Sequence, residues 1–181
     1  EVPIMKGLLG YRQLIIRKQD EAIFKKITSA EELKKFTVGQ ARGWQDVNVF
    51  RLNGYKVDDT ANLPSLFSML NSKRFDYLPM SIAEVKSALA TNQEYGAGFM
   101  AAPNIIIYYP FPIIFYVSET QPKLAERLRK GLIIASKDGS LDTLFGDFFA
   151  DDIAQVKKHH PRIFILDNPY IPKHLLQGPP R

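Results

Sequence analysis

The segment 36–46, F-T-V-G-Q-A-R-G-W-Q-D, combines residue types that could hold a small solute. An apolar run at 36–38 predicts a strand, the glycine after it predicts a turn, and residues 45–53 predict a helix. A helix start presents unpaired N–H groups and a positive dipole end, which favour a carboxylate. Arg42 could add a two-pronged charged contact, and Trp44 a flat apolar or cation-binding face. We interpret this segment as one wall of a small-molecule site; the alternative is an ordinary strand-to-helix turn.

A second segment, 75–84, has the same organisation. Residues 75–78 predict a strand, and Ser81 followed by Glu84 has the spacing of a capping box that starts a helix. The carboxyl ends of parallel strands meet at one edge of a sheet, which is where ligands bind in α/β proteins. We therefore expect residues 39–44 and 79–84 to lie at the same sheet edge.

Catalytic patterns are sparse. The three histidines are His159, His160 and His174, and two adjacent histidines do not have metal-ligand spacing. No G-x-S-x-G, Walker or H-E-x-x-H motif occurs, and Asp151-Asp152 is interpreted as a helix cap. We predict that the protein is not an enzyme, with no catalytic residue, metal or cofactor.

The composition bounds the class of protein. A chain of 181 residues with 45% hydrophobic content is long enough for one large or two small packed domains. The net charge of +5 is spread along the sequence, which argues against a nucleic-acid partner. There is no cysteine, so cysteine usage does not indicate whether the protein resides in an oxidising or a reducing compartment. The N-terminus has no signal-peptide pattern, so any such segment has been removed or never existed.

Strand-like and helix-like segments alternate, which predicts an α/β fold with a mainly parallel sheet and flanking helices. Pro110 and Pro112 interrupt the apolar stretch 105–117, which predicts two strands joined at a stiff turn. The other predicted strands lie near 11–18, 55–57 and 163–166. The other predicted helices lie near 20–26, 30–35, 64–73, from 122 to 137 and over 141–149.

Several segments taken in order resemble the type 2 periplasmic solute-binding proteins, in the family 3-like branch that serves ABC transporters of polar amino acids. They are G-L-L-G-Y-R (7–12), V-G-Q-A-R-G-W-Q-D (38–46), L-F-S-M-L-N-S-K-R-F-D-Y (66–77), Y-Y-P-F-P (108–112), L-A-E-R-L-R-K-G-L (124–132), D-G-S (138–140) and L-D-N-P (166–169).

The resemblance implies two α/β lobes that close on a solute. Residues 28–110 would form a complete second lobe, and 1–27 with 111–181 would form hinge strands and a partial first lobe that lacks its N-terminal part. The ligand-binding residues it implies are Gln40, Arg42, Gly43, Trp44, Met80, Ser81 and Glu84. The usual small Ser or Thr of the first turn is replaced by residues 41–44, which indicates a larger or more acidic solute.

The resemblance further implies non-enzymatic binding of a small polar solute in the periplasm, and delivery to the membrane permease of an ABC transporter. The alternative of another class is a ligand-sensing domain of a signalling receptor. A cell-wall lyase is a third possibility, which the lack of acid/base residues disfavours. The incomplete first lobe would allow self-association through its exposed surface.

Overall fold

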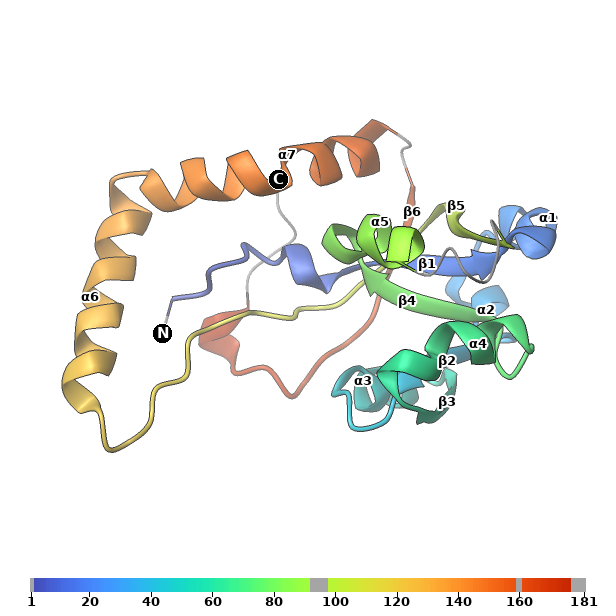
Figure 1. Ribbon diagram of the computed structural model, residues 1–181, viewed down its shortest axis with the longest axis horizontal. Coiled ribbons are helices and arrows are strands. Elements are labelled where there is room, and N and C mark those ends of the chain that lie inside the picture. Colours follow the sequence, from blue (N-terminus) through green and yellow to red (C-terminus); the bar gives the residue numbers. More distant parts are fainter. Residues whose placement is uncertain (1, 92–97, 159–160, 177–181) are drawn as a thin grey trace.

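The computed structural model describes residues 2–91, 98–158 and 161–176 (Figure 1). A six-stranded sheet with the order β3-β2-β4-β1-β5-β6 forms its centre. The strands are β1 (Tyr11–Arg17), β2 (Thr37–Ala41), β3 (Lys56–Ala61), β4 (Tyr77–Ser81), β5 (Phe99–Tyr108) and β6 (Arg162–Ile165).

Three neighbouring strand pairs run parallel, namely β2–β3, β2–β4 and β5–β6. Strand β1 runs antiparallel to both of its neighbours, β4 and β5. The predicted α/β fold with a mainly parallel sheet is therefore confirmed. Because β1 opposes β4, its first residues lie at the edge where β2 and β4 end, and Arg12 stands opposite Ser81.

The helices connect these strands. They are α1 (Glu21–Lys25), α2 (Ala30–Leu33), α3 (Asp46–Leu52), α4 (Leu66–Asn71), α5 (Ile82–Thr91), α6 (Pro122–Lys137) and α7 (Ser140–Lys158). Short 3-10 turns occupy Leu8–Gly10, Lys18–Asp20, Leu63–Ser65 and Lys173–Leu175. Side-chain caps explain several helix starts: the Ser29 hydroxyl accepts from the Glu32 N–H at 3.3 Å, and the Glu84 carboxylate accepts from the Ser81 N–H at 3.1 Å.

Both faces of the sheet are buried. Leu14 and Ile16 of β1 join one apolar cluster, whereas Ile15 between them joins the cluster on the opposite face. Alternate residues of a strand point to opposite faces, so the uninterrupted run Leu-Ile-Ile is what a doubly covered strand requires. Tyr77 and Leu78, adjacent residues of β4, follow the same rule and belong to the first and second cluster respectively.

Three local predictions are wrong. The turn predicted to begin at Gly39 starts later, because Gly39 and Gln40 are part of β2; a Cβ on Gly39 would lie 2.2 Å from the Phe75 ring, so the glycine permits close packing. The second strand predicted within 105–117 is absent, since residues 109–118 form no helix or strand and prolines cannot donate to a ladder. Asp151-Asp152 lie inside α7, which continues to Lys158.

Helices α6 and α7, residues 122–158, form what we call the α6–α7 arm: α6 stands apart from the sheet, and α7 leads back from it toward α5 and β6 (Figure 1). Helix α6 has no buried residue. Helix α7 contacts the rest of the protein through Phe145, Phe149 and Ile153, which pack on a third apolar cluster that includes Leu8 and Tyr108.

The predicted division into lobes at residues 28 and 110 stays a prediction. The sheet runs continuously across these positions, because β1 lies between β4 and β5, and β6 pairs with β5. Leu14 of β1, Phe24 of α1 and Leu166 after β6 share one apolar cluster with Tyr77 of β4. Segments on both sides of the predicted boundaries are thus packed around a common core.

Candidate functional site

A groove of about 410 Å³ lies at the predicted sheet edge, where β2 and β4 end and β1 begins. The 3-10 turn before β1, the β2–α3 turn, the end of β4 and the chain after β5 all contribute to it. Its lining residues are Leu9, Arg12, Gly43, Trp44, Gln45, Asp46, Pro79, Met80, Glu84 and Phe111. Segments 39–44 and 79–84 were predicted from the sequence to share an edge, and Gly43 and Trp44 of the first line the same cavity as Pro79, Met80 and Glu84 of the second.

An ion pair forms the floor of this groove. The Arg12 Nη2 lies 2.8 Å from the Asp46 Oδ1, and the two side chains are only 7% and 9% exposed. The Tyr109 hydroxyl donates a hydrogen bond to the same Asp46 oxygen. Burial raises the pKa of Tyr109 well above its ordinary value of 10.0, although the nearby Arg12 acts in the opposite direction. Tyr109 is therefore a protonated donor at neutral pH, and Asp46 receives two polar contacts.

Two neighbouring aromatic rings pack against the Arg12 guanidinium. Its central carbon lies 5.3 Å from the centroid of the Tyr109 ring and 5.0 Å from that of Phe111. Arginine stacks well on aromatic faces because its charge is delocalised and weakly hydrated. The start of β1 and the chain that leaves β5 are thereby joined at the groove, where the Tyr109 N–H also donates to the Gly10 carbonyl at 3.2 Å.

The end of β4 supplies the opposite wall. Met80 is partly buried and packs against the second apolar cluster. Ser81 is fully buried and does not line the groove; its hydroxyl accepts from the Ala83 N–H at 3.4 Å and so caps α5. The Glu84 carboxylate lines the groove while its Oε2 accepts from the Ser81 N–H. The capping box predicted from the sequence therefore also fixes the position of Glu84.

The β2–α3 turn places Gly43 and Trp44 in the groove but not Arg42. Gly43 has a φ of 82°, a conformation that glycine adopts without a steric penalty. Trp44 is half-buried against the second apolar cluster. The Arg42 guanidinium instead donates from Nη2 to the Thr60 carbonyl at 3.2 Å, so it is directed at the end of β3.

Gln40 is also outside the groove lining. Its side chain is fully buried in β2, and its amide Oε1 and Nε2 both have no hydrogen-bond partner among the described residues. Of the seven ligand-binding residues predicted from the sequence, the structure brings Gly43, Trp44, Met80 and Glu84 together in the groove. Whether these residues bind a ligand stays a prediction.

Sequence reasoning missed Arg12, Asp46 and Phe111. Arg12 carried only a weak signal, because it is a charged residue in a predicted strand that also contains Gln13 and Arg17. Asp46 closes the segment that drew attention to the site, yet its partner lies 34 positions earlier in the chain. Only the antiparallel pairing of β1 with β4 brings Arg12 to this edge, and that pairing has no local sequence signature.

Metal-binding clusters and membrane spans are both missing from the described parts of the chain, residues 2–91, 98–158 and 161–176. There, no three side chains of metal-ligating type lie close enough together to hold an ion. No described helix is long and apolar enough to cross a bilayer. The pair His159-His160 lies outside the described residues.

Comparison with known proteins identifies the fold. No protein-family model and no curated protein matches the sequence. Solved structures do match: an ancestral arginine-binding protein bound to arginine is 25% identical, with a TM-score of 0.53 over 81% of this chain and 62% of that chain. An arginine transport-system periplasmic binding protein from Legionella pneumophila is 16% identical, with a TM-score of 0.56 over 82% of this chain and 64% of that one.

A third match is a putative ABC-transporter binding component from Wolinella succinogenes complexed with lysine. It is 15% identical, with a TM-score of 0.55 over 81% of this chain and 60% of that one. The resemblance stated from the sequence is confirmed at the level of fold. This chain has the fold of the type 2 periplasmic amino-acid-binding proteins and spans about three-fifths of the length of those structures.

Proposed function

We propose that this chain binds a small polar, amino-acid-like solute in the groove at the ends of β2 and β4, without covalent chemistry. The observation that carries the proposal is the groove itself, where charged, aromatic and apolar side chains from separate elements converge. Small-ligand sites have this character: an apolar wall with a few placed polar groups. The volume of about 410 Å³ lies within the usual range for such sites.

The fold supports the biological setting that we propose. The matched structures are named as arginine-binding and lysine-complexed proteins, one of them periplasmic and another a component of an ABC transporter. We therefore propose a periplasmic binding protein that presents its solute to a membrane permease. Closure would bend the two adjacent segments at the groove, namely 9–12 and 109–111, since they connect the sheet to the α6–α7 arm and the N-terminal segment.

The chain's single tryptophan gives a direct test of the groove. Because Trp44 lines it, solute binding should change the tryptophan emission of the purified chain. A panel of amino acids, opines, dicarboxylates and oligopeptides would be titrated, with amide NMR spectra of labelled protein to place the contact. We expect at least one amino-acid-like solute to shift the signals of residues 43–46 and 79–84.

Two methionines provide a matched pair of variants. Met69 and Met80 both pack partly buried against the same apolar cluster, but only Met80 is among the groove-lining residues. Met80→Ala should weaken solute binding, while Met69→Ala should lower stability to a similar degree and leave binding unchanged. Binding by no member of the panel, or equal weakening by both variants, would contradict the proposal.

A further inference from the structure

The charges that line the groove do not cancel. Its ionisable lining residues are Arg12, Asp46 and Glu84, which sum to one surplus carboxylate. This local excess of negative charge stands out because the whole chain carries a net charge of +5. Surface charges beyond about 8–10 Å are largely screened at physiological ionic strength, so a solute responds mainly to the groove's own groups.

The positive charge of Arg12 is already compensated by the Asp46 carboxylate. Its guanidinium is paired with Asp46 at 2.8 Å and lies against the rings of Tyr109 and Phe111, and the Asp46 oxygen also accepts a hydrogen bond from the Tyr109 hydroxyl. A solute carboxylate that approached Arg12 would have to compete with a buried partner that is already in place. Removing either member from such a pair leaves the other charge buried and uncompensated, which is strongly unfavourable.

Glu84 is the charge that remains for the solute. It is exposed at the first turn of α5, and one of its oxygens is held by the Ser81 N–H at 3.1 Å. This contact orients the carboxylate without neutralising it, because a backbone N–H carries no formal charge. Trp44, in the β2–α3 turn, also lines the groove, and the face of its aromatic ring attracts cations.

The cationic side chains of Arg42 and Lys86 are near the groove in sequence but do not line it. Arg42 donates to the Thr60 carbonyl at the end of β3. Lys86, two residues after Glu84, lines a separate cavity of about 440 Å³ between α5 and β5, together with Asp152. Among the described residues that line the groove, Arg12 is thus the single cation, and it is paired.

We propose that the solute carries a positive group, an ammonium or guanidinium at the end of a side chain, that pairs with Glu84 beside Trp44. This inference rests on the proposed solute-binding function and narrows it to cationic solutes. It also reverses the expectation of a more acidic solute, which was based on residues 41–44, since Arg42 is turned away from the groove.

L-Arginine and L-citrulline form the decisive pair of probes, because they have nearly the same shape and differ in side-chain charge. Tryptophan emission and amide NMR titrations of the full chain should show arginine binding about two- to fivefold more tightly, the size of an exposed ion pair. L-Glutamate should bind more weakly than either.

Glu84→Gln tests the assigned residue. Glutamine keeps an oxygen that can accept the Ser81 N–H, so the α5 cap is retained while the charge is removed. The preference for arginine over citrulline should then disappear. Glu31→Gln is the matched control, because it makes the same charge change on α2, where Glu31 pairs with Lys34 at 2.7 Å. It should leave the preference unchanged.

The outcomes separate this inference from the proposed function. If citrulline or glutamate binds as tightly as arginine, or if Glu84→Gln keeps the preference, the cationic assignment is overturned while solute binding stands. If no probe and no member of the wider panel binds, both proposals fail together.

Discussion

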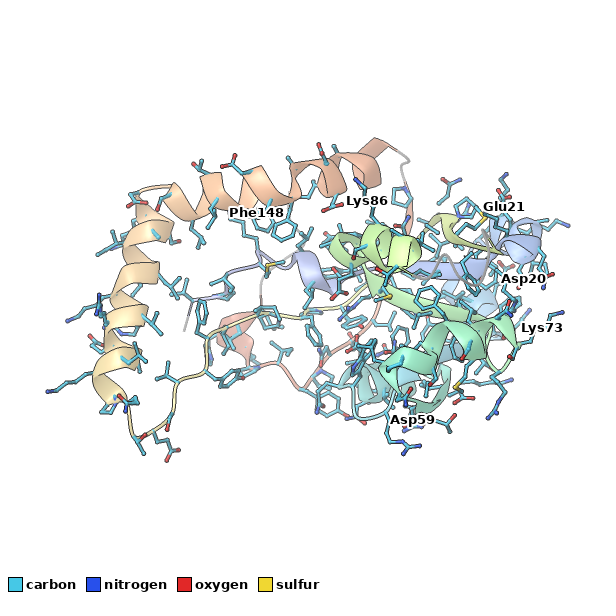
Figure 2. All side chains as sticks on the ribbon, in the orientation of Figure 1. Asp20, Glu21, Asp59, Lys73, Lys86 and Phe148 are labelled. Atoms are coloured by element: carbon cyan, nitrogen blue, oxygen red, sulfur yellow. The ribbon has the colours of Figure 1, made fainter. Side chains whose placement is uncertain are left out.

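The sheet with α1–α5, which we call the sheet body, and the α6–α7 arm use their apolar residues in opposite ways. The sheet body buries them on both faces of the strands, in clusters that include Leu14, Phe24 and Phe75. In the arm, Leu124, Ile134 and Leu144 are each about half exposed or more, and Phe148 is 71% exposed on a helix set apart from most of the sheet (Figure 2).

This difference shows that amphipathic periodicity and burial are separate properties. The helix predicted from 122 to 137 is confirmed as α6, in which Leu124, Leu128 and Leu132 have the spacing of one apolar helix face. A helix needs a packing partner to bury that face, and α6 contributes no buried residue. Stability should therefore depend on the sheet body and respond weakly to changes in the arm.

The largest effect should come from the buried ion pair. Asp46→Ala leaves the Arg12 charge buried without its partner, which should cost about 3–5 kcal/mol of unfolding free energy. Glu126→Ala is the comparison in the arm, where Glu126 contacts Arg129 at 2.9 Å on an exposed surface. It should not change the denaturation midpoint measurably. If urea unfolding showed that both variants lose the same unfolding free energy, the arm would be as important to stability as the sheet body.

Leucine truncations make the same comparison for apolar packing. Leu14→Ala removes a fully buried side chain from the first cluster and should cost about 2–5 kcal/mol. Leu124→Ala removes one that is 46% exposed and should cost less than about 0.5 kcal/mol. Urea unfolding followed by circular dichroism measures both, and a loss above that limit for Leu124 would mean that α6 is covered in solution.

Alkaline pH should destabilise the sheet body selectively. Burial raises the pKa of Tyr77 and of Tyr109 well above 10.0, so both keep their protons in the folded state when unfolded tyrosines ionise. The unfolded state then binds fewer protons, and stability should fall above pH 10 by about 1.4 kcal/mol per pH unit for each tyrosine.

The measurement is the denaturation midpoint against pH, together with tyrosinate absorbance. Tyr109→Phe should make the alkaline slope shallower, whereas Tyr116→Phe, at an 89% exposed position, should leave it unchanged. Ionisation of every tyrosine near pH 10 without unfolding would contradict the burial of these two rings.

Glycine-to-alanine changes should have opposite signs in the two regions. A Cβ at Gly39 would lie 2.2 Å from the Phe75 ring, so Gly39→Ala should cost about 1–3 kcal/mol through overpacking. Gly131 lies within α6, and an alanine Cβ there would meet no atom within 4 Å beyond its own helix backbone and chain neighbours. Gly131→Ala should therefore stabilise α6 by about 0.5–1 kcal/mol. Thermal melts of both variants test the signs, and destabilisation by Gly131→Ala would indicate a packed neighbour.

The sequence by itself determined most elements and part of the site. Apolar runs and capping residues are local signals, and the sequence predicted β1, the start of α5 and the extent of α6 to within a few residues. They also predicted that residues 39–44 and 79–84 lie at one edge, because parallel strands end together, and parts of both segments line the groove.

Only the tertiary structure decided the remaining features. The pairing of β1 between β4 and β5 brings Arg12 to Asp46, and strand order depends on contacts between distant segments that no local pattern encodes. The same packing turns Arg42 to Thr60, buries Gln40 in β2 and leaves Glu84 as the surplus charge of the groove. Residue types thus indicated where a solute site would lie, and the fold decided which charges face it.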